Sequence, residues 1–251
     1  MKSIIEVKNL YISFKEKKVL KGVTFSLSEG ECLALIGGSG DGKSTLLRSI
    51  IGLESPTSGQ ILFDGKNILR FDVEQYIFIR KQISYVFQGG ALFDSMTVYD
   101  NLAFPLREHT DWSEEKIKKA VLHELKEFEL EGSENIYPTE LSGGMQKRVG
   151  VARAIIIKPK VILYDEPTSG LDPYTKKNMQ KAIIKMQKRG ATSMIVTHDM
   201  QTALKVCDRV ALLKGGKIQA VDTPKNFREN PNIFLNNFIK GIKQGENDES
   251  A

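Results

Sequence analysis

The chain has 251 residues, 41% of them hydrophobic and 27% charged, the proportions of an ordinary globular protein with one large domain or a core and a smaller insert. Its formal net charge of +5 suits a neighbouring anionic lipid or nucleotide, and equally a generally solvated surface. No apolar run approaches the roughly 18–20 residues that cross a bilayer, and Glu6 interrupts any secretory signal region, so we expect a cytosolic protein unless a partner holds it to a membrane.

Two kinds of β-rich run occur along the chain. Runs separated by Gly, Ser or Lys turns predict an antiparallel layer: residues 4–10, 19–27 and 60–63. Runs separated mostly by helical patterns predict a parallel sheet: residues 32–36, 161–164, 193–197 and 209–213. Together they predict an α/β fold with a parallel core sheet and an added antiparallel β layer.

A glycine-rich loop directly follows the strand at residues 32–36. It fits the pattern GxxxxGK[ST] and comprises Gly37, Gly38, Ser39, Gly40, Asp41, Gly42, Lys43, Ser44 and Thr45. Glycines let successive backbone N–H groups face a phosphate, and the helix that follows adds its positive N-terminal end. Lys43 is expected to reach the β- and γ-phosphates and Ser44 to ligate Mg²⁺, while the acidic Asp41 must point outward. Alone, the loop leaves kinases, GTPases and ATPases open.

The middle of the chain, residues 89–157, has a helical pattern. Ile117, Val121, Leu125 and Phe128 recur at spacings of four and three residues, and Ser113 suits a helix start. We therefore predict an inserted helical subdomain at residues 89–157. The ATP-binding core then comprises residues 1–88 and 158–240, and residues 241–251 form a disordered, polar and acidic tail.

Residues 141–146 contain a second candidate anion site. Ser142, Gly143 and Gly144 can offer a hydroxyl and backbone N–H groups at a helix N-terminus. Because one loop of the GxxxxGK[ST] type binds one triphosphate, a second site is most useful if it covers the nucleotide of another copy.

Two adjacent acids end the apolar run at residues 161–164. Where a strand ends and the chain turns, both carboxylates can approach a γ-phosphate. Asp165 is expected to hold Mg²⁺, directly or through water, and Glu166 to polarise the attacking water. Alone, such a pair is often a solvated turn, but the phosphate loop favours the catalytic interpretation. The two cysteines, Cys32 and Cys207, lack metal-ligand spacing and are interpreted as reduced, buried thiols.

These motifs resemble those of the ABC ATPases, in the same order, from about residue 4 to residue 238. The resemblance implies a P-loop NTPase fold with a RecA-like core, and ATP and Mg²⁺ as cofactors. It assigns Phe14 to adenine stacking (with Tyr11 as a nearby competitor) and Gln88 to Mg²⁺ and to a link with the helical insert. Asp172 falls in the D-loop at the dimer interface, and His198 matches the switch histidine that contacts the γ-phosphate. Two copies would then sandwich two ATP molecules.

The region after Gln88 bears on the transported substrate. Residues 89–93, 104–110, 147–149 and 234–241 look like the Mla-type ATPases, which serve lipid transport with MCE proteins. This resemblance implies a permease dimer, an MCE-domain lipid-binding protein and, as a further candidate, a small STAS-like subunit. It also implies a peripheral position on the cytoplasmic side of the inner membrane and a phospholipid cargo.

Other interpretations of the function and the substrate stay open at this point. Residues 107–110 can be a polar loop without substrate information, and the ATPase can serve amino acids or lipoproteins instead. Nucleic acid is not expected as a partner, because no Lys/Arg stripe alternates with aromatic residues. An inactive regulatory subunit is disfavoured by the intact Lys43, Asp165, Glu166 and His198.

Overall fold

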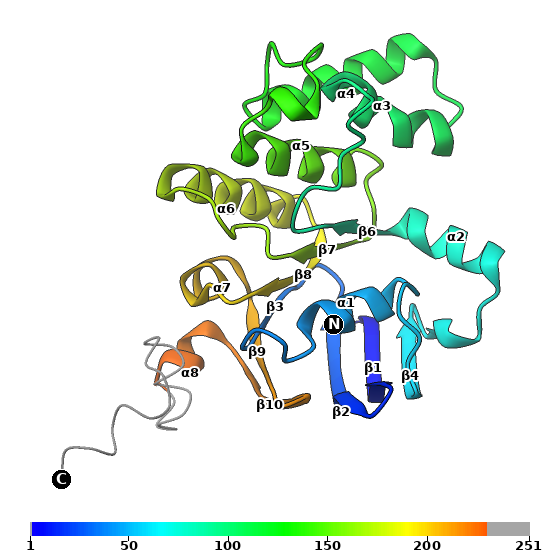
Figure 1. Ribbon diagram of the computed structural model, residues 1–251, viewed down its shortest axis with the longest axis vertical. Helices are drawn as coiled ribbons and strands as arrows, with labels where there is room; N and C mark the ends of the chain where they lie inside the picture. Colours follow the sequence, from blue (N-terminus) through cyan, green and yellow to red (C-terminus); the bar gives the residue numbers. More distant parts are fainter. Residues whose placement is uncertain (1, 230–251) are drawn as a thin grey trace.

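The computed structural model describes residues 2–229, which form two β-sheets flanked by helices (Figure 1). The antiparallel sheet has the order β2-β1-β4-β5. Its strands are β1 (Ser3–Phe14), β2 (Lys17–Ser28), β4 (Ser58–Phe63) and β5 (Lys66–Asn67). The second sheet has the order β10-β9-β3-β8-β7-β6, and only β10 runs antiparallel to its neighbour. Its strands are β3 (Cys32–Ile36), β6 (Ile83–Val86), β7 (Val161–Asp165), β8 (Thr192–Thr197), β9 (Arg209–Lys214) and β10 (Lys217–Asp222). The predicted parallel core and antiparallel layer are both confirmed.

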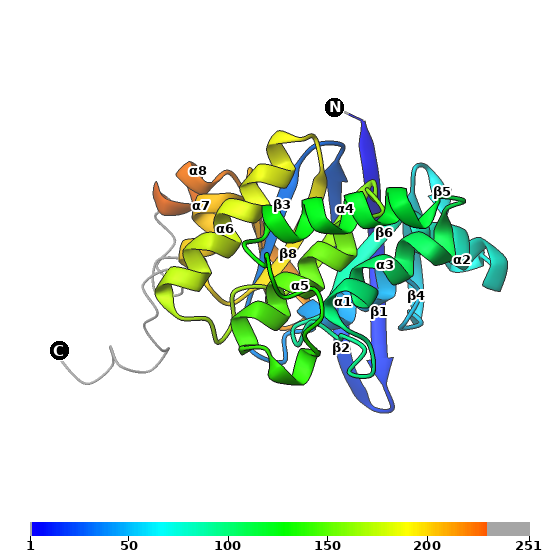
Figure 2. The ribbon, with the colours of Figure 1, turned by 90° about the horizontal axis from the view of Figure 1, so that it is seen from above.

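Most of the helices lie on one side of the larger sheet. Figure 1 draws α3, α4, α5 and α6 above it, with α1 and the antiparallel sheet below. In order, the helices are α1 (Lys43–Ile50), α2 (Val73–Gln82), α3 (Val98–His109), α4 (Glu114–Glu127), α5 (Gly143–Ile155), α6 (Pro173–Lys188), α7 (Met200–Val206) and α8 (Pro224–Glu229). Figure 2, from above, shows α3, α4 and α5 lying over the strands. No helix within residues 2–229 is long and apolar enough to cross a membrane.

The larger sheet is buried on both faces, which explains its continuous apolar strands. Alternate side chains of a strand point to opposite faces. In β3, Cys32, Ala34 and Ile36 pack with the helices α3 to α7, whereas Leu33 and Leu35 pack with α1 and the antiparallel sheet. Two hydrophobic cores therefore hold β3 rigidly, and the phosphate loop begins where β3 ends.

The helical middle of the chain agrees with the sequence pattern in most respects. Ser113 caps α4 by accepting a hydrogen bond from Lys116 N, and the face predicted from Ile117, Val121 and Leu125 is buried. Residues 107–109 form the end of α3 rather than a loop. The Arg107 side chain forms ion pairs with Asp100 and Glu114.

Helix α2 was not predicted from the sequence. Its apolar side chains do not form one buried stripe: Val73, Ile77 and Phe78 are exposed and only Ile79 is fully buried. Without a single apolar face, the pattern lacks the 3.6-residue period of a helix that packs on a core. The predicted domain boundaries remain a proposal, and the predicted tail, like the Mla-like residues 234–241, lies outside the described residues.

Candidate functional site

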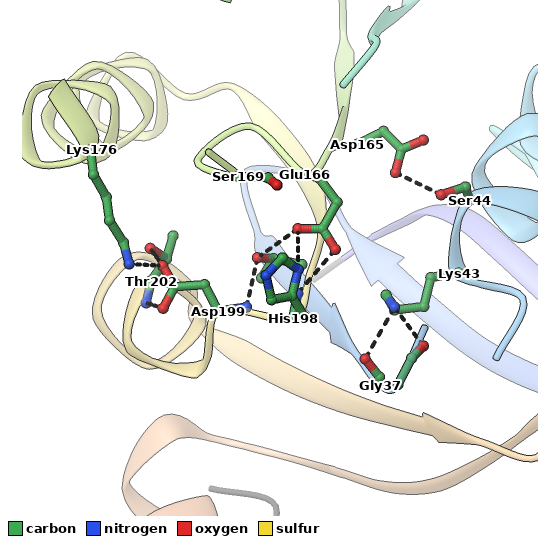
Figure 3. A network of polar contacts seen from close by, with 12 residues as sticks. Gly37, Lys43, Ser44, Asp165, Glu166, Ser169, Lys176, His198, Asp199 and Thr202 are labelled. Carbon is green, nitrogen blue, oxygen red and sulfur yellow. Dashed lines mark hydrogen bonds and ion pairs between the residues drawn. The ribbon is translucent and has the colours of Figure 1, made fainter. Parts of the chain in front are cut away.

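The glycine-rich loop connects β3 to α1 and curls around the Lys43 side chain. The Lys43 ammonium donates hydrogen bonds to Gly37 O at 3.0 Å and Gly38 O at 2.8 Å (Figure 3). Gly42, just before α1, has φ of +100°, a conformation open to glycine but costly for other residues. A Cβ at Gly37 would lie 2.3 Å from Leu213 O, so this position also requires glycine. The loop is thus folded against β9 with its cation already inside.

A cavity of about 570 Å³ opens on this loop. It lies at the edge of the sheet where β3, β7 and β8 end, as expected for a ligand site in an α/β sheet. Its lining comprises Lys17, Val19, Ser39, Gly40, Gly42, Lys43, Ser44, Thr45, Gln88, Glu166 and His198. Of the predicted ATP-site residues, most of the loop, Gln88, Glu166 and His198 are therefore brought together by the fold.

Asp41 belongs to the loop but does not line the cavity. Its carboxylate accepts hydrogen bonds from Gly38 N at 2.7 Å and Gly215 N at 3.1 Å. The side chain is thus directed to the base of the loop and to the β9–β10 turn. These bonds link the loop to the turn after β9.

Asp165 is the last residue of β7 and is held by two hydroxyl groups. Ser44 Oγ donates to its Oδ1 at 2.8 Å and Tyr85 OH to its Oδ2 at 2.7 Å. Burial, with the hydrogen bond to Asp165, raises the pKa of Tyr85 far above its usual value, so the phenol remains a donor. Both carboxylate oxygens of Asp165 are therefore fixed, Oδ1 by Ser44 at the end of the loop and Oδ2 by Tyr85 of β6.

Glu166 turns its carboxylate in a different direction from Asp165. Its φ of +51° is the left-handed conformation, uncommon for a residue with a side chain and often found at functional sites. His198 N donates to Oε1 at 3.1 Å, Thr197 Oγ1 donates to Oε2 at 3.3 Å, and His198 Nδ1 lies 2.9 Å from Oε2. An acid and an imidazole thus face the cavity side by side (Figure 3).

The segment that carries His198 is fixed on its far side as well. Asp199 caps α7 by accepting from Gln201 N and Thr202 N, and its other oxygen receives the Lys176 ammonium at 2.5 Å. Burial alone would raise the pKa of Asp199, but the hydrogen bonds from Lys176 and Thr202 outweigh it and hold the pKa below its usual value. The segment that carries His198 is therefore held by Glu166 at His198 and by helix α6 at Asp199.

The remaining predicted residues lie away from this cavity. Ser142 and Gly143 are exposed at the N-terminus of α5, where the Ser142 hydroxyl accepts from Met145 N. Asp172 caps α6 and does not line the cavity. Phe14 ends β1 with 45% exposure and is likewise absent from the lining, to which the nearby β2 contributes Lys17 and Val19.

Several residues of the site were missed in the sequence. Tyr85 and Thr197 place the two acids, and Lys176 supports the histidine segment through Asp199. Each acts on a partner from another strand or helix, so no spacing along the chain marks it. Cys32 and Cys207 are free and buried as predicted, and their sulfur atoms lie 3.3 Å apart.

Comparisons with known proteins agree with this geometry. A family model described as ABC transporter matches residues 20–169. The chain belongs to the ABC transporter family. Its fold is confirmed by a dimeric structure of the ATP-binding cassette MJ0796 in a post-hydrolysis state, bound to ADP and Pi, with a TM-score of 0.82. The two are 34% identical over 88% of this chain and 98% of that one. The chain is therefore an ATP-binding, ATP-hydrolysing domain of the ABC type.

Relatives of this ABC ATPase are named for several substrates. The spermidine/putrescine import ATP-binding protein PotA of Mesoplasma florum is 38% identical over 239 residues, 94% of this chain and 67% of that protein. The probable ribonucleotide transport ATP-binding protein mkl of Mycobacterium leprae is 44% identical over 210 residues, 83% of this chain and 60% of that protein. The chain thus spans about two thirds of the length of such relatives. Their names do not single out lipid as the substrate.

Proposed function

We propose that two copies of this ABC ATPase enclose two MgATP molecules and that their closure drives a partner permease. One observation carries the proposal: Ser142 and Gly143 are exposed at a helix N-terminus outside the ATP cavity of their own chain. Such an N-terminus favours an anion. In a pair, the N-terminus of α5 would cover the triphosphate bound by the partner, and Asp172 would lie at the interface.

The residues of the cavity have separate tasks in this proposal. Lys43 and the loop N–H groups bind the β- and γ-phosphates, and Gln88, on the cavity wall, contacts Mg²⁺ and links the site to the helical insert. Ser44 and Asp165 fit Mg²⁺, which in nucleotide sites needs only one or two protein oxygens besides the phosphates. The ion neutralises charge on the phosphates. Phe14, beside the cavity-lining strand β2, is retained as the candidate for adenine.

Glu166 is the group proposed to orient and deprotonate the attacking water. Its carboxylate is held in place by hydrogen bonds from His198 N and Thr197 Oγ1, as a positioned base requires. The His198 imidazole is 63% exposed on the cavity side and can turn toward a γ-phosphate. Hydrolysis would remove the charge that holds the two chains together and allow them to open.

Glu166→Gln tests this arrangement directly. We expect ATP binding to persist and hydrolysis to slow by about 10²-fold, the usual loss for a general base. The variant should also accumulate as an ATP-bound dimer in size-exclusion chromatography with light scattering. Glu115→Gln, an exposed acid on α4, is the matched control. Wild-type turnover by Glu166→Gln, or a strictly monomeric ATP complex, would refute the proposal.

A groove beside the ATP cavity is proposed to receive the permease. It measures about 430 Å³ and includes the exposed rings of Phe87 and Phe93, with Phe104 and His109 from α3. Arg153 stabilises its wall, donating to Gly90 O and Ala91 O with its guanidinium 5.4 Å from the Phe93 ring centroid. The groove adjoins Gln88, so movement of a bound permease segment could reach the γ-phosphate.

For the cargo, we propose a phospholipid, moved with an MCE-domain protein and a STAS-like subunit at the cytoplasmic face of the inner membrane. Support comes from the Mla-like residues 104–110, of which Phe104, Pro105 and His109 line the permease groove. A small polar substrate is the second candidate, favoured by relatives named for spermidine/putrescine and ribonucleotide transport. Co-purification of an MCE-domain protein and bound phospholipid with the assembled transporter would support the first candidate, and a polar-solute-binding partner would overturn it.

A further inference from the structure

A second large cavity lies at the opposite edge of the parallel sheet from the ATP cavity. It has a volume of about 650 Å³ and opens where β7 and β8 begin, whereas the ATP cavity lies where these strands end. Strands of this length separate the two edges by about 16 Å, at about 3.3 Å per residue. The second cavity is therefore a distinct site, and nothing in the ATP chemistry uses it.

Glu124, on α4, is the unusual residue in this cavity. Its Oε2 is fully buried and has no hydrogen-bond partner within residues 2–229. Burial, the largest influence, raises the pKa of Glu124 above its usual value, although nearby cations oppose this effect. Buried polar atoms nearly always have partners, and leaving one unpaired costs about 1–3 kcal/mol. Because Glu124 also lines the cavity, a change of its side-chain rotamer would bring this carboxylate to a hydrogen-bond donor of a ligand.

The rest of the lining supplies two further kinds of contact. Ile155, Ile162 and Met186 form an apolar wall. Lys158, just beyond α5, makes no hydrogen bond or ion pair through its ammonium among the described residues, and Arg189 also lines the cavity. Arg189 is already paired with Glu127, so Lys158 is the cation free to meet an acid at the cavity mouth. An apolar cavity with a few convergent polar groups is the usual form of a small-molecule site.

We propose that this cavity binds a small apolar zwitterion, of the class of α-amino acids with aliphatic or aromatic side chains. The ligand's ammonium group donates to Glu124, its carboxylate meets Lys158, and its side chain packs on Ile155, Ile162 and Met186. A simple amine would satisfy Glu124 but would be repelled by the cations, and a simple acid would leave Glu124 unpaired. A molecule with both groups matches the charges of Glu124 and Lys158 together.

Binding here would join two parts of the molecule. Glu124 and Ile155 belong to α4 and α5, whereas Ile162 and Met186 belong to β7 and α6. A ligand that contacts both sides favours the arrangement in which they are closest. Because the N-terminus of α5 carries Ser142, such a ligand would also change the rate of ATP hydrolysis by the full chain.

The test is calorimetric titration of the full chain with L-leucine and L-phenylalanine, compared with N-acetyl-L-leucine, which lacks the cationic amine, and 3-methylbutylamine, which lacks the acid. We expect submillimolar binding of at least one amino acid and at least tenfold weaker binding of both analogues. Glu124→Gln and Lys158→Met should each weaken amino-acid binding at least tenfold and leave the basal ATPase rate unchanged. Glu115→Gln on the exposed face of α4 is the control that retains binding.

Three results would overturn the proposal: no binding of either amino acid at millimolar concentration, equal binding of the blocked analogues, or unchanged affinity in Glu124→Gln. If Glu124→Gln unfolds, Lys158→Met decides, because Lys158 is exposed and supports no other group. The outcome is separate from that of the Glu166→Gln experiment, since binding is measured without nucleotide.

Discussion

At the scale of single residues, the ATP site depends on groups that hold the acids. Asp165 and Glu166 are neighbours in sequence, but each is oriented by its own donors. Tyr85 and Ser44 hold Asp165, and the positive φ of Glu166 turns its carboxylate to His198. The effect of a substitution therefore depends on which acid loses its support.

Tyr85→Phe removes one donor from Asp165 and leaves its second, Ser44, in place. We expect the Mg²⁺ concentration that gives half-maximal ATPase activity to rise about tenfold. This is the lower end of the loss in metal affinity when a group that orients a metal ligand is removed. Titration of ATPase activity with Mg²⁺ at saturating ATP measures this effect. Tyr99→Phe, on α3, is the matched control, and an identical Mg²⁺ dependence in both variants would contradict the role of Tyr85.

Lys43→Ala removes the ammonium that now bonds to Gly37 O and Gly38 O and that is proposed to move to the phosphates. Because a charged hydrogen bond contributes about 1.5–3 kcal/mol, ATP affinity should fall by at least about tenfold. Fluorescent-nucleotide titration measures it, with Lys118→Ala on α4 as the control. Unchanged affinity would remove the phosphate-binding role of the loop lysine.

At the scale of elements, α6 and α7 are joined through one ion pair. Lys176 on α6 contacts Asp199, the N-cap of α7, and both side chains are mostly buried. Asp199 N donates in turn to Thr197 Oγ1, which donates to Glu166. A displacement of α6 can thus reach Glu166, the proposed catalytic base, through Asp199 and Thr197.

Lys176→Met breaks this ion pair and should lower the free energy of unfolding by about 1 kcal/mol at pH 7. The folded-state pKa of Asp199 is lowered from 3.8, so its ionised form stabilises the fold above about pH 3.8. That stability is lost as the pH falls through the lower folded-state pKa. The difference between variant and wild type should therefore shrink in strong acid.

Urea denaturation at pH 7 and at pH 3 measures the free energy of unfolding of the variant and the wild type, and so the difference between them at each pH. Lys177→Met, the exposed neighbour on α6, is the control and should match the wild type at both values. A difference that grows as the pH is lowered would show that the pair does not stabilise the fold.

At the scale of the whole molecule, the two proposed anion sites lie apart within one chain. The phosphate loop lines the ATP cavity, whereas Ser142 lies at the exposed start of α5. Lys147, one turn into α5, donates to Ser169 O, so the start of α5 is tied to the segment just before Asp172. In the proposed pair, a second copy supplies these elements to the ATP site.

Ser142→Arg places a bulky cation at the N-terminus of α5, where the helix dipole disfavours positive charge. We expect ATP binding to persist while hydrolysis falls by about 10²-fold, the scale for losing donors that stabilise developing charge. When the variant is mixed with wild-type chains, the ATPase activity should fall in proportion to the fraction of dimers that contain one variant chain. Full activity of Ser142→Arg, with unchanged dimer formation, would contradict a site shared by two chains.

Much of the fold was predictable because its signals are local. The loop at residues 37–45, the acids after β7 and the cap at Ser113 each follow from neighbouring residues. Helix α2 was missed because its exposed Val73, Ile77 and Phe78 obscure the helical period. Residues 107–109 were ambiguous because Arg107 is held in the helix by Asp100 and Glu114, partners seven residues away on each side.

The sequence by itself determined that this chain binds a nucleoside triphosphate, because the phosphate loop acts mainly through its own backbone and contiguous residues. Only the tertiary structure decided how the acids are aimed, since Tyr85, Thr197 and Lys176 reach them from other strands and helices. The tertiary structure alone placed Ser142 outside the ATP cavity and left Glu124 Oε2 without a partner beside a second cavity. Burial and distance between remote residues arise only when the sheet brings its two edges and its helices together.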